Sequence, residues 1–160
     1  MDLVQHKEQV LKKRKENSVF FKLLAKEKAK VLDKLIHPIH DDVFEHTNCL
    51  KCANCCKTTG PLFTDKDIQR ISKYLKIKPS EFVDRYLRVD EDNDYVLQSV
   101  PCFFLGEDNY CSIYEVRPKA CREYPHTDRI KQYQLLKLTE KNLDICPAVF
   151  EIVEKIKTKL

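Results

Sequence analysis

Apolar residues recur at steps of three and four through the first 36 residues, which contain neither glycine nor proline. This period, together with the abundance of Lys, Glu, Leu and Ala, predicts one or two helices over residues 1–36. Asn17 and Ser18 can cap the second helix, and Pro38 is expected to end it because proline has no amide hydrogen. The apolar stripe consists of Phe20, Phe21, Leu24, Val31, Leu32 and Leu35.

The middle of the chain predicts two short helices. Thr64 precedes two aspartates and can cap the first helix, with Phe63 packing onto Ile68. Pro79 suits the first turn of the second helix. The expected buried positions are Ile68, Ile71, Tyr74 and Leu75 in the first helix, and Phe82, Val83, Tyr86 and Leu87 in the second.

Extended structure is expected in three places. Residues 95–97 read as a strand, and residues 101–114 read as an antiparallel hairpin that carries Cys102 and Cys111 on either side of a turn. Residues 133–138 can form a last strand. This content predicts a mainly α fold with a small antiparallel β hairpin or sheet.

Two further helices are expected near the C-terminus. Pro118 begins a short helix that contains Cys121, and Cys146-Pro147 leads into a terminal helix. The buried stripe of that terminal helix is Val149, Phe150, Val153 and Ile156. Taken together, the pattern predicts an N-terminal basic amphipathic helix over 1–40 and a second domain over 41–160, which contains all the cysteines of the chain.

Composition narrows the class of protein. Apolar residues make up 42% and charged residues 34% of the chain, as in soluble globular proteins. Only two glycines are present, which argues against a phosphate-binding loop or a dinucleotide fold. No apolar run is long enough to span a membrane, and Met1 to Lys7 lack the apolar stretch of a secretory signal, so a cytoplasmic location is expected.

Positive charge is concentrated at the N-terminus. Residues 1–36 hold ten basic and five acidic side chains, whereas the whole chain has a net charge of +4. The basic residues of this segment alternate with glutamates, and Arg14 is the only arginine among them. This pattern favours a solvated helix face over a nucleic-acid site. An interaction module that uses this helix remains an alternative, with its partner unknown.

Eight cysteines carry the candidate chemistry. The first four follow the spacing C-x2-C-x2-C-C, and C-x2-C spacing is found in zinc knuckles and iron–sulfur proteins. A chain expected inside the cell favours metal binding over disulfides. The predicted metal ligands are Cys49, Cys52, Cys55, Cys56, Cys102, Cys111, Cys121 and Cys146, with His46 as a reserve ligand.

Four sequence segments together resemble the YkgJ-like cysteine-cluster family, also called CxxCxxCC. They are Cys49 to Cys56, Cys102-Phe103-Phe104-Leu105, Cys111-Ser112-Ile113-Tyr114, and Arg117-Pro118 followed by Cys121-Arg122-Glu123-Tyr124-Pro125. The resemblance covers roughly residues 46–147 and implies chelation of zinc or iron. Flagellin lysine methylases are similar in their cysteine pattern. This leaves open a metal-dependent redox or methyl-transfer accessory domain, although a stand-alone enzyme is not expected.

The sulfurs of the neighbours Cys55 and Cys56 are expected to point apart and to serve different centres. Cys49, Cys52 and Cys55 with the remote Cys146-Pro147 resemble the ferredoxin arrangement of a [4Fe–4S] cluster. The other set would then be Cys56, Cys102, Cys111 and Cys121, suited to zinc or to another cluster. Arg117 and Arg122 lie near these thiols in sequence, where they can offset thiolate charge or pair with Glu115 and Glu123.

Overall fold

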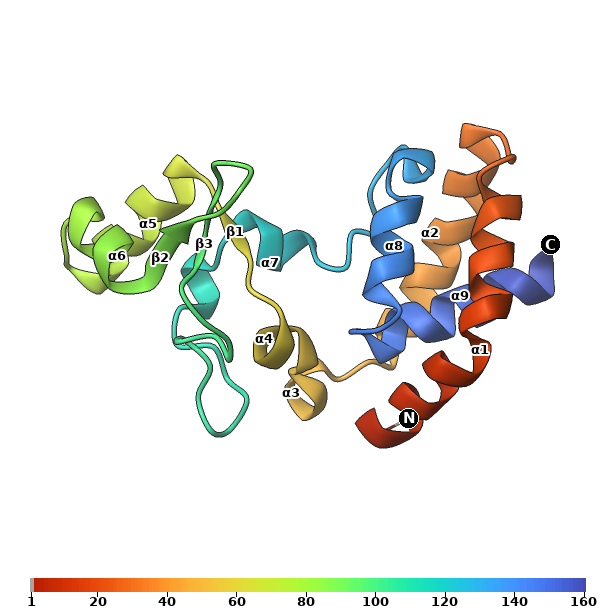
Figure 1. Cartoon of the computed structure of the whole chain (residues 1–160), viewed down its shortest axis with the longest axis horizontal. Coiled ribbons are helices and arrows are strands. Elements are labelled where there is room, and N and C mark those ends of the chain that lie inside the picture. The colour runs from red at the N-terminus through yellow and green to blue at the C-terminus, as the bar shows by residue number, and fades with distance from the viewer. Residues whose placement is uncertain (1) are drawn as a thin grey trace. The chain divides into compact units, whose positions relative to one another are not determined.

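The computed structural model describes residues 2–160, whose packing forms two compact units. The helical unit contains the chain up to Cys52 together with Pro125–Leu160, and the sheet unit is Ala53–Tyr124. The predicted mainly α fold with a small antiparallel sheet is confirmed (Figure 1). The proposed domain division at residue 40 stays a prediction.

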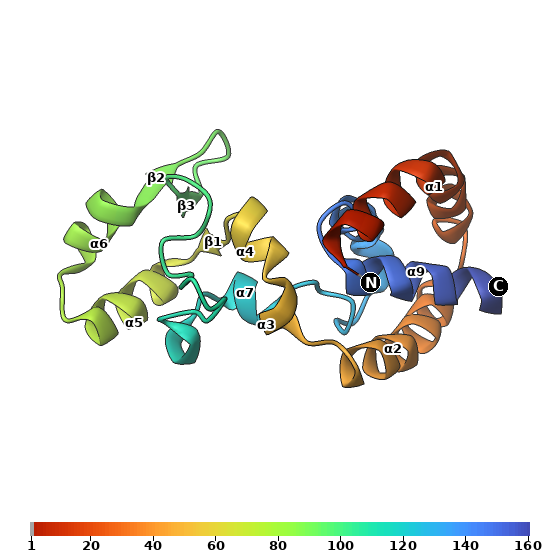
Figure 2. The ribbon, with the colours of Figure 1, turned by 90° about the horizontal axis from the view of Figure 1, so that it is seen from below.

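The helical unit consists of α1 (Leu3–Leu24), α2 (Ala29–Glu45), α3 (Cys49–Cys52), the 3-10 turn η2 (Gln132–Gln134), α8 (Leu136–Asn142) and α9 (Pro147–Lys159). Helix α9 packs against both α1 and α2, and α8 packs against α1 (Figure 2). Among residues 2–160, no helix has the length and apolar character needed to cross a membrane.

Two helices span the first 45 residues, but their boundary differs from the prediction. Helix α1 continues through Asn17, which is buried, and the Asn17 side chain accepts a hydrogen bond from Lys157 Nζ at 2.6 Å. Because of that contact, Asn17 lies within α1 and does not cap a second helix. The cap of α1 is Asp2, whose carboxylate accepts from the Gln5 amide at 2.8 Å.

Helix α2 runs through Pro38, where the sequence predicted its end. Pro38 lies on the exposed side, so its ring faces solvent rather than a packed neighbour. Leu32, Ile36, Ile39 and Val43 of the same helix are buried in the core. The packing of these four residues offsets the missing backbone hydrogen bond.

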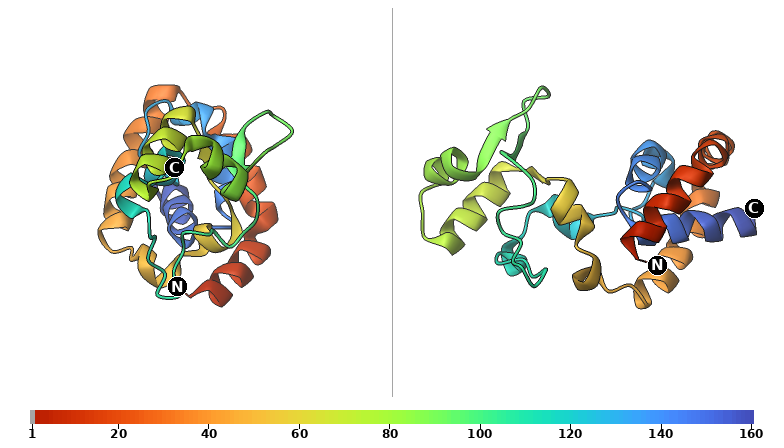
Figure 3. Two further views of the ribbon diagram at one scale, coloured as in Figure 1. Left: turned by 90° about the vertical axis from the view of Figure 1, so that its left-hand side faces the viewer. Right: turned by 60° about the horizontal axis from the view of Figure 1, so that its bottom comes forward.

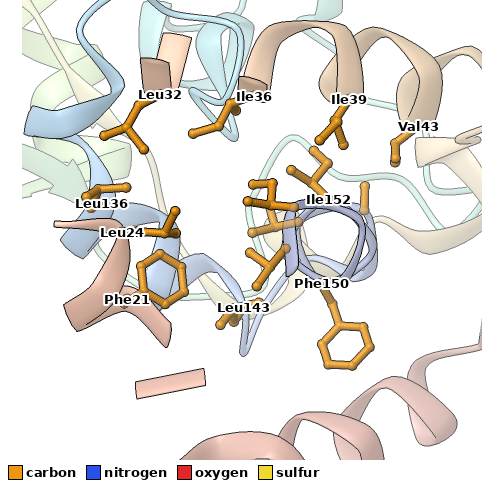
Figure 4. Packing of buried hydrophobic residues seen from close by; sticks show 14 of the residues in the cluster. Phe21, Leu24, Leu32, Ile36, Ile39, Val43, Leu136, Leu143, Phe150 and Ile152 are labelled. Carbon is orange, nitrogen blue, oxygen red and sulfur yellow. The ribbon is translucent and has the colours of Figure 1, made fainter. Parts of the chain in front are cut away.

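The core of the helical unit is built from α1, α2, α8 and α9. Figure 4 shows Leu32, Ile36, Ile39 and Val43 of α2 directed toward α9, with Phe21 and Leu24 contributed by α1. The expected terminal helix is confirmed as α9, and all four residues of its predicted stripe are buried.

The sheet unit contains α4 (Asn54–Thr58), β1 (Leu62–Phe63), α5 (Asp65–Leu75), α6 (Pro79–Tyr86), β2 (Leu87–Val89), β3 (Tyr95–Leu97), the 3-10 turn η1 (Tyr114–Val116) and α7 (Lys119–Glu123). The strands are antiparallel in the order β1-β3-β2. In the right-hand view of Figure 3, the yellow-green helices α5 and α6 lie beside the green strands of the same unit. Leu62 pairs with Val96, and Arg88 also pairs with Val96. Its smaller core gathers around Phe82, which stacks on Phe104 with ring centroids 6.1 Å apart.

The predicted starts of α5, α6 and α7 are confirmed. Thr64 caps α5 in a capping box with Asp67, Pro79 opens α6, and Pro118 precedes α7. Tyr74, however, is half exposed rather than buried, since α5 turns only Ile68, Ile71 and the partly buried Leu75 toward the core.

Two predicted β segments are wrong. The hairpin that was expected to carry Cys102 and Cys111 is reduced to one bridge, between Leu105 and Cys111, and the sheet forms elsewhere. Residues 133–138 belong to η2 and α8 instead of a strand. Leu136, Thr139 and Asn142 are buried at steps of three, so a helical turn faces the core where an alternating strand would not.

Candidate metal centre

The segment from Cys49 to Cys56 folds into two short helical turns. Cys49 and Cys52 bound α3, while Cys55 and Cys56 lie in α4. Ala53 separates the turns in the left-handed conformation, with φ at 47°. A residue in that conformation reverses the helical path, so the two pairs of cysteines belong to separate turns.

Four cysteines gather in the sheet unit: Cys56, Cys102, Cys111 and Cys121. The Cys102 amide donates to the Cys56 carbonyl at 2.8 Å, which fixes these two segments together. Leu105 connects the segment that carries Cys111. The Leu105 amide donates to the Cys102 carbonyl at 3.1 Å, and Leu105 forms a β-bridge with Cys111. Cys121 lies in α7.

The thiols of this set influence one another electrostatically. Burial raises the pKa of Cys121, and with the smaller contribution from the negative charge of Cys56, Cys102 and Cys111 the pKa reaches about 12. Burial likewise raises the pKa of Cys102 to about 11, with Cys56 and Cys111 adding to the effect. Sulfurs that repel one another as thiolates in this way are suited to share a cation, which removes the repulsion.

Backbone amides already point at two of these sulfurs. The Cys102 thiol accepts from the amides of Phe104 and Leu105, and the Cys111 thiol accepts from the amide of Ile113. These bonds lower the pKa of each thiol against the larger effect of burial. Hydrogen bonds to a ligand atom orient it and stabilise its charged form, as expected of thiolates in a metal site.

The thiols of Cys55 and Cys56 are hydrogen-bonded to each other, so their sulfurs do not point apart as the sequence predicts. A hydrogen bond with the Cys55 thiol lowers the pKa of Cys56 to about 7, and the nearby charge of Lys57 acts in the same direction against burial. Within the set of four thiols, the pKa of Cys56 is therefore lowered, whereas the pKa values of Cys102, Cys111 and Cys121 are raised.

A second set lies in the helical unit and consists of Cys49, Cys52 and Cys146. Cys146 is the N-cap of α9, and its sulfur accepts from the amides of Ala148 and Val149. Burial raises the pKa of Cys146 to about 11, and the charges of Cys49 and Cys52 contribute. A helix N-terminus favours negative charge, so the position of Cys146 suits a thiolate ligand.

Arg117 is a positive charge that lowers the pKa of two thiols of the sheet unit, as Lys57 does for Cys56. It lowers the pKa of both Cys111 and Cys121, although burial dominates at each. Its guanidinium stacks on Tyr114 at 3.8 Å and donates to the Tyr114 carbonyl at 2.8 Å. Arg122 donates to the Arg117 carbonyl at 3.3 Å. Of the two arginines, Arg117 is thus the one placed to offset the negative charge of the thiolates.

Two residues that the sequence reading did not connect to the site hold this region in place. The buried Asp67 carboxylate accepts from the Lys119 amide at 3.1 Å and from Arg70 at 2.6 Å. Arg70 also donates to the carbonyls of Val116 and Arg117, at 3.3 and 2.9 Å. From the sequence, Asp67 is recognisable only as an acidic residue at a helix start. Its contact with Lys119 could not be predicted, because the two residues are 52 positions apart.

His46 stands at the end of α2, where its Nδ1 hydrogen-bonds the Asp42 carbonyl at 3.1 Å. All eight cysteines are thiols. Among residues 2–160, no group of three or more His, Cys, Asp or Glu side chains has a geometry that would hold a metal ion. The sulfur donors therefore fit zinc and iron in chemistry, while their positions are not those of a closed site.

These features define a helical, cysteine-rich protein with a small antiparallel sheet and two sets of thiols. The chain belongs to the CxxCxxCC family, whose model is described as a "putative zinc- or iron-chelating domain" and matches residues 48–147. All eight cysteines lie in that range, so the expected family is confirmed, and with it metal chelation as the kind of function.

One relative is the "Uncharacterized protein MJ0661" of Methanocaldococcus jannaschii. It is 38% identical to this chain over 93 residues, which are 55% of this chain and 49% of the relative. The chain thus spans about half the length of that curated relative. No solved structure matches the chain.

Proposed function

We propose that this protein binds metal at two thiolate centres. The observation that carries the proposal is the set Cys56, Cys102, Cys111 and Cys121, four mutually interacting thiols supplied by one compact unit. Four thiolates match the ligand number of a closed structural zinc site. Zinc is the ion proposed for this set.

The second centre involves Cys49, Cys52 and Cys146. Their spacing, with a Cys-Pro dipeptide remote in sequence, supports an iron–sulfur cluster at this set. A cubane cluster takes four thiolates, and the fourth is proposed to be Cys55, from the C-x2-C-x2-C spacing alone. Reduced thiols and intracellular metal handling also support a cytoplasmic location.

The test is metal analysis of protein purified without air, combined with native mass spectrometry and visible spectroscopy. The expected result is about one zinc per chain together with iron, inorganic sulfide and broad visible absorbance from thiolate-to-iron charge transfer. Two zinc ions and a colourless protein would replace the cluster with a second zinc site. A metal-free protein with disulfides would contradict the proposal.

A further inference from the structure

Helix α1 is apolar on two sides, and only one side packs within the helical unit. His6, Val10, Asn17, Phe21 and Leu24 are its buried residues. Helix α1 contacts α8 and α9 on that side and lies at the outside of the unit (Figure 2). Four large aliphatic side chains elsewhere on the helix are instead exposed by 54% to 70%: Val4, Leu11, Val19 and Leu23.

These four residues follow one another along the helix at steps of seven, eight and four. Such steps correspond to two turns, two turns and one turn, so the side chains form a continuous stripe on the outward face. Val4 to Leu23 spans about 29 Å at 1.5 Å per residue. A stripe of that length matches another helix laid alongside it.

Lysines are interleaved with the stripe. Lys15 lies four residues from both Leu11 and Val19, and Lys22 lies three residues from Val19. Lys7 and Lys12 are exposed nearby. Within residues 2–160 none of these four lysines forms an ion pair, in contrast to Lys13, which pairs with Glu154 on the buried side. We name Val4, Leu11, Val19, Leu23 and these four lysines the outer face of α1.

We infer that the outer face of α1 binds an acidic amphipathic helix of another protein. Such a helix covers the aliphatic residues and places carboxylates opposite the lysines. Nucleic acid would neutralise the lysines but leave the four aliphatic side chains in water. A bilayer would have to desolvate Lys15, which lies between aliphatic residues rather than at the margin of the stripe.

A second copy of this chain is also a poor match in charge. Glu8 and Glu16 are the acidic residues beside the outer face, and Glu16 is paired with Lys157, so two such faces would bring four lysines against four lysines. The matching region of the CxxCxxCC family begins at residue 48, beyond α1. The inferred partner therefore concerns a part of this chain outside its metal-binding region, and does not depend on the proposed centres.

The test is fluorescence anisotropy of the full-length protein with a labelled synthetic helix of about three heptads, with leucine at a and d and glutamate at e and g. A peptide of the same composition in scrambled order is the control for charge alone. The expected result is a dissociation constant of about 10 μM or tighter for the patterned peptide and at least about tenfold weaker binding of the scrambled one.

Matched variants locate the contact. Lys15→Glu with Lys22→Glu, and separately Leu11→Ser with Leu23→Ser, should each weaken binding at least about tenfold. Lys66→Glu with Lys73→Glu makes the same charge change on exposed residues of α5 and should leave binding unchanged. Circular dichroism of each variant checks that α1 still forms, as expected for surface substitutions.

Three outcomes would overturn the inference. One is no binding of the patterned peptide, or binding that the α1 variants leave unchanged. Another is binding to anionic phosphatidylglycerol vesicles that is lost in the Leu11→Ser, Leu23→Ser variant while the peptide does not bind. The last is self-association in sedimentation velocity that the same variant abolishes, which would make the occupant a second copy.

Discussion

At the scale of single residues, the adjacent cysteines Cys55 and Cys56 are the point at which the two proposed centres meet along the chain. Their thiols are hydrogen-bonded to each other, yet Cys56 also interacts with Cys102, Cys111 and Cys121. Once metal replaces this hydrogen bond, the two adjacent side chains can direct their sulfurs to different centres. The pair therefore allows two centres to be distinguished by single substitutions.

Cys56→Ser is expected to remove the zinc and leave the iron, because serine is a poor ligand for soft metals. Cys55→Ser should do the opposite. Metal content per chain, measured by elemental analysis after anaerobic purification, decides between the outcomes. Loss of all metal in both variants would indicate a single cooperative centre, and full metal content in either would remove that cysteine from the ligand set.

His6 gives the helical unit a dependence on pH. It is buried beside Phe150, and its Nε2 donates to the Leu143 carbonyl at 2.8 Å. Burial lowers the pKa of His6 below the ordinary value of 6.5, against the hydrogen bond to Leu143 and the charge of Asp144. Below pH 6.5 the unfolded chain therefore takes up the proton first, and folding becomes less favourable.

The free energy of unfolding is accordingly expected to be constant above pH 6.5 and to fall as the pH drops below it, by at most about 1.4 kcal/mol per pH unit for one histidine. Denaturant melts at several pH values measure this. His6→Gln should flatten the dependence in part, because burial also lowers the pKa of His40. An unchanged slope in His6→Gln would show that His6 is not responsible.

At the scale of elements, the start of α5 supports the segment that carries Cys121. Asp67 caps this helix start through Thr64, and it also holds the Lys119 amide and Arg70. A carboxylate with this many buried donors leaves several of them unsatisfied when it is removed. The same side chain thus contributes to the helix and to the position of α7.

Asp67→Ala is expected to lower the free energy of unfolding by about 3 kcal/mol, because it breaks a buried ion pair and a helix cap together. Asp65→Ala is the matched control, since Asp65 is exposed in the same helical turn and should cost about 0.5 kcal/mol or less. Urea titrations of the metal-loaded variants compare the two. An equal decrease in the free energy of unfolding in the two variants would mean that the contacts of Asp67 with Arg70 and Lys119 do not stabilise the fold.

Pro38 is a second element-scale feature, because α2 continues through it. Pro38→Ala restores a backbone hydrogen bond in the helix interior and should raise the free energy of unfolding by about 1 to 2 kcal/mol. Pro79→Ala is the control, since Pro79 occupies the first turn of α6, where proline is favourable. A destabilised Pro38→Ala variant would show that the proline is required for the path of α2.

At the scale of the whole molecule, the two units differ in how much apolar packing they contain. Among residues 2–160, the core of the helical unit has 15 buried apolar residues and that of the sheet unit has 8. The smaller core supplies less free energy from burial. The sheet unit should therefore depend more strongly on bound metal.

Chelation of the metal is expected to increase hydrogen exchange in residues 53–124 much more than in α2 and α9. A structural zinc site contributes on the order of 10 kcal/mol to folding, which exceeds what a core of this size supplies. Exchange followed by mass spectrometry, with and without chelator, compares the units directly. Equal protection of the sheet unit in both states would contradict its dependence on metal.

The sequence determined most of the helices, because their signals are local. Thr64, Pro79, Pro118 and Cys146-Pro147 each mark a helix start through their own backbone chemistry, and α5, α6, α7 and α9 begin there. The cysteine spacing likewise identified the family, because chelation depends on the type of the ligand residues and on their separation along the chain.

The tertiary structure decided the features that depend on distant partners. Asn17 lies inside α1 because Lys157 meets it, and α2 continues through Pro38 because its buried side packs in the core. Residues 133–138 became helical because Leu136 and its neighbours had a core to face. The association of Cys121 with Cys56, Cys102 and Cys111 also required the fold, since contacts such as that of Asp67 with Lys119 join residues that no local pattern relates.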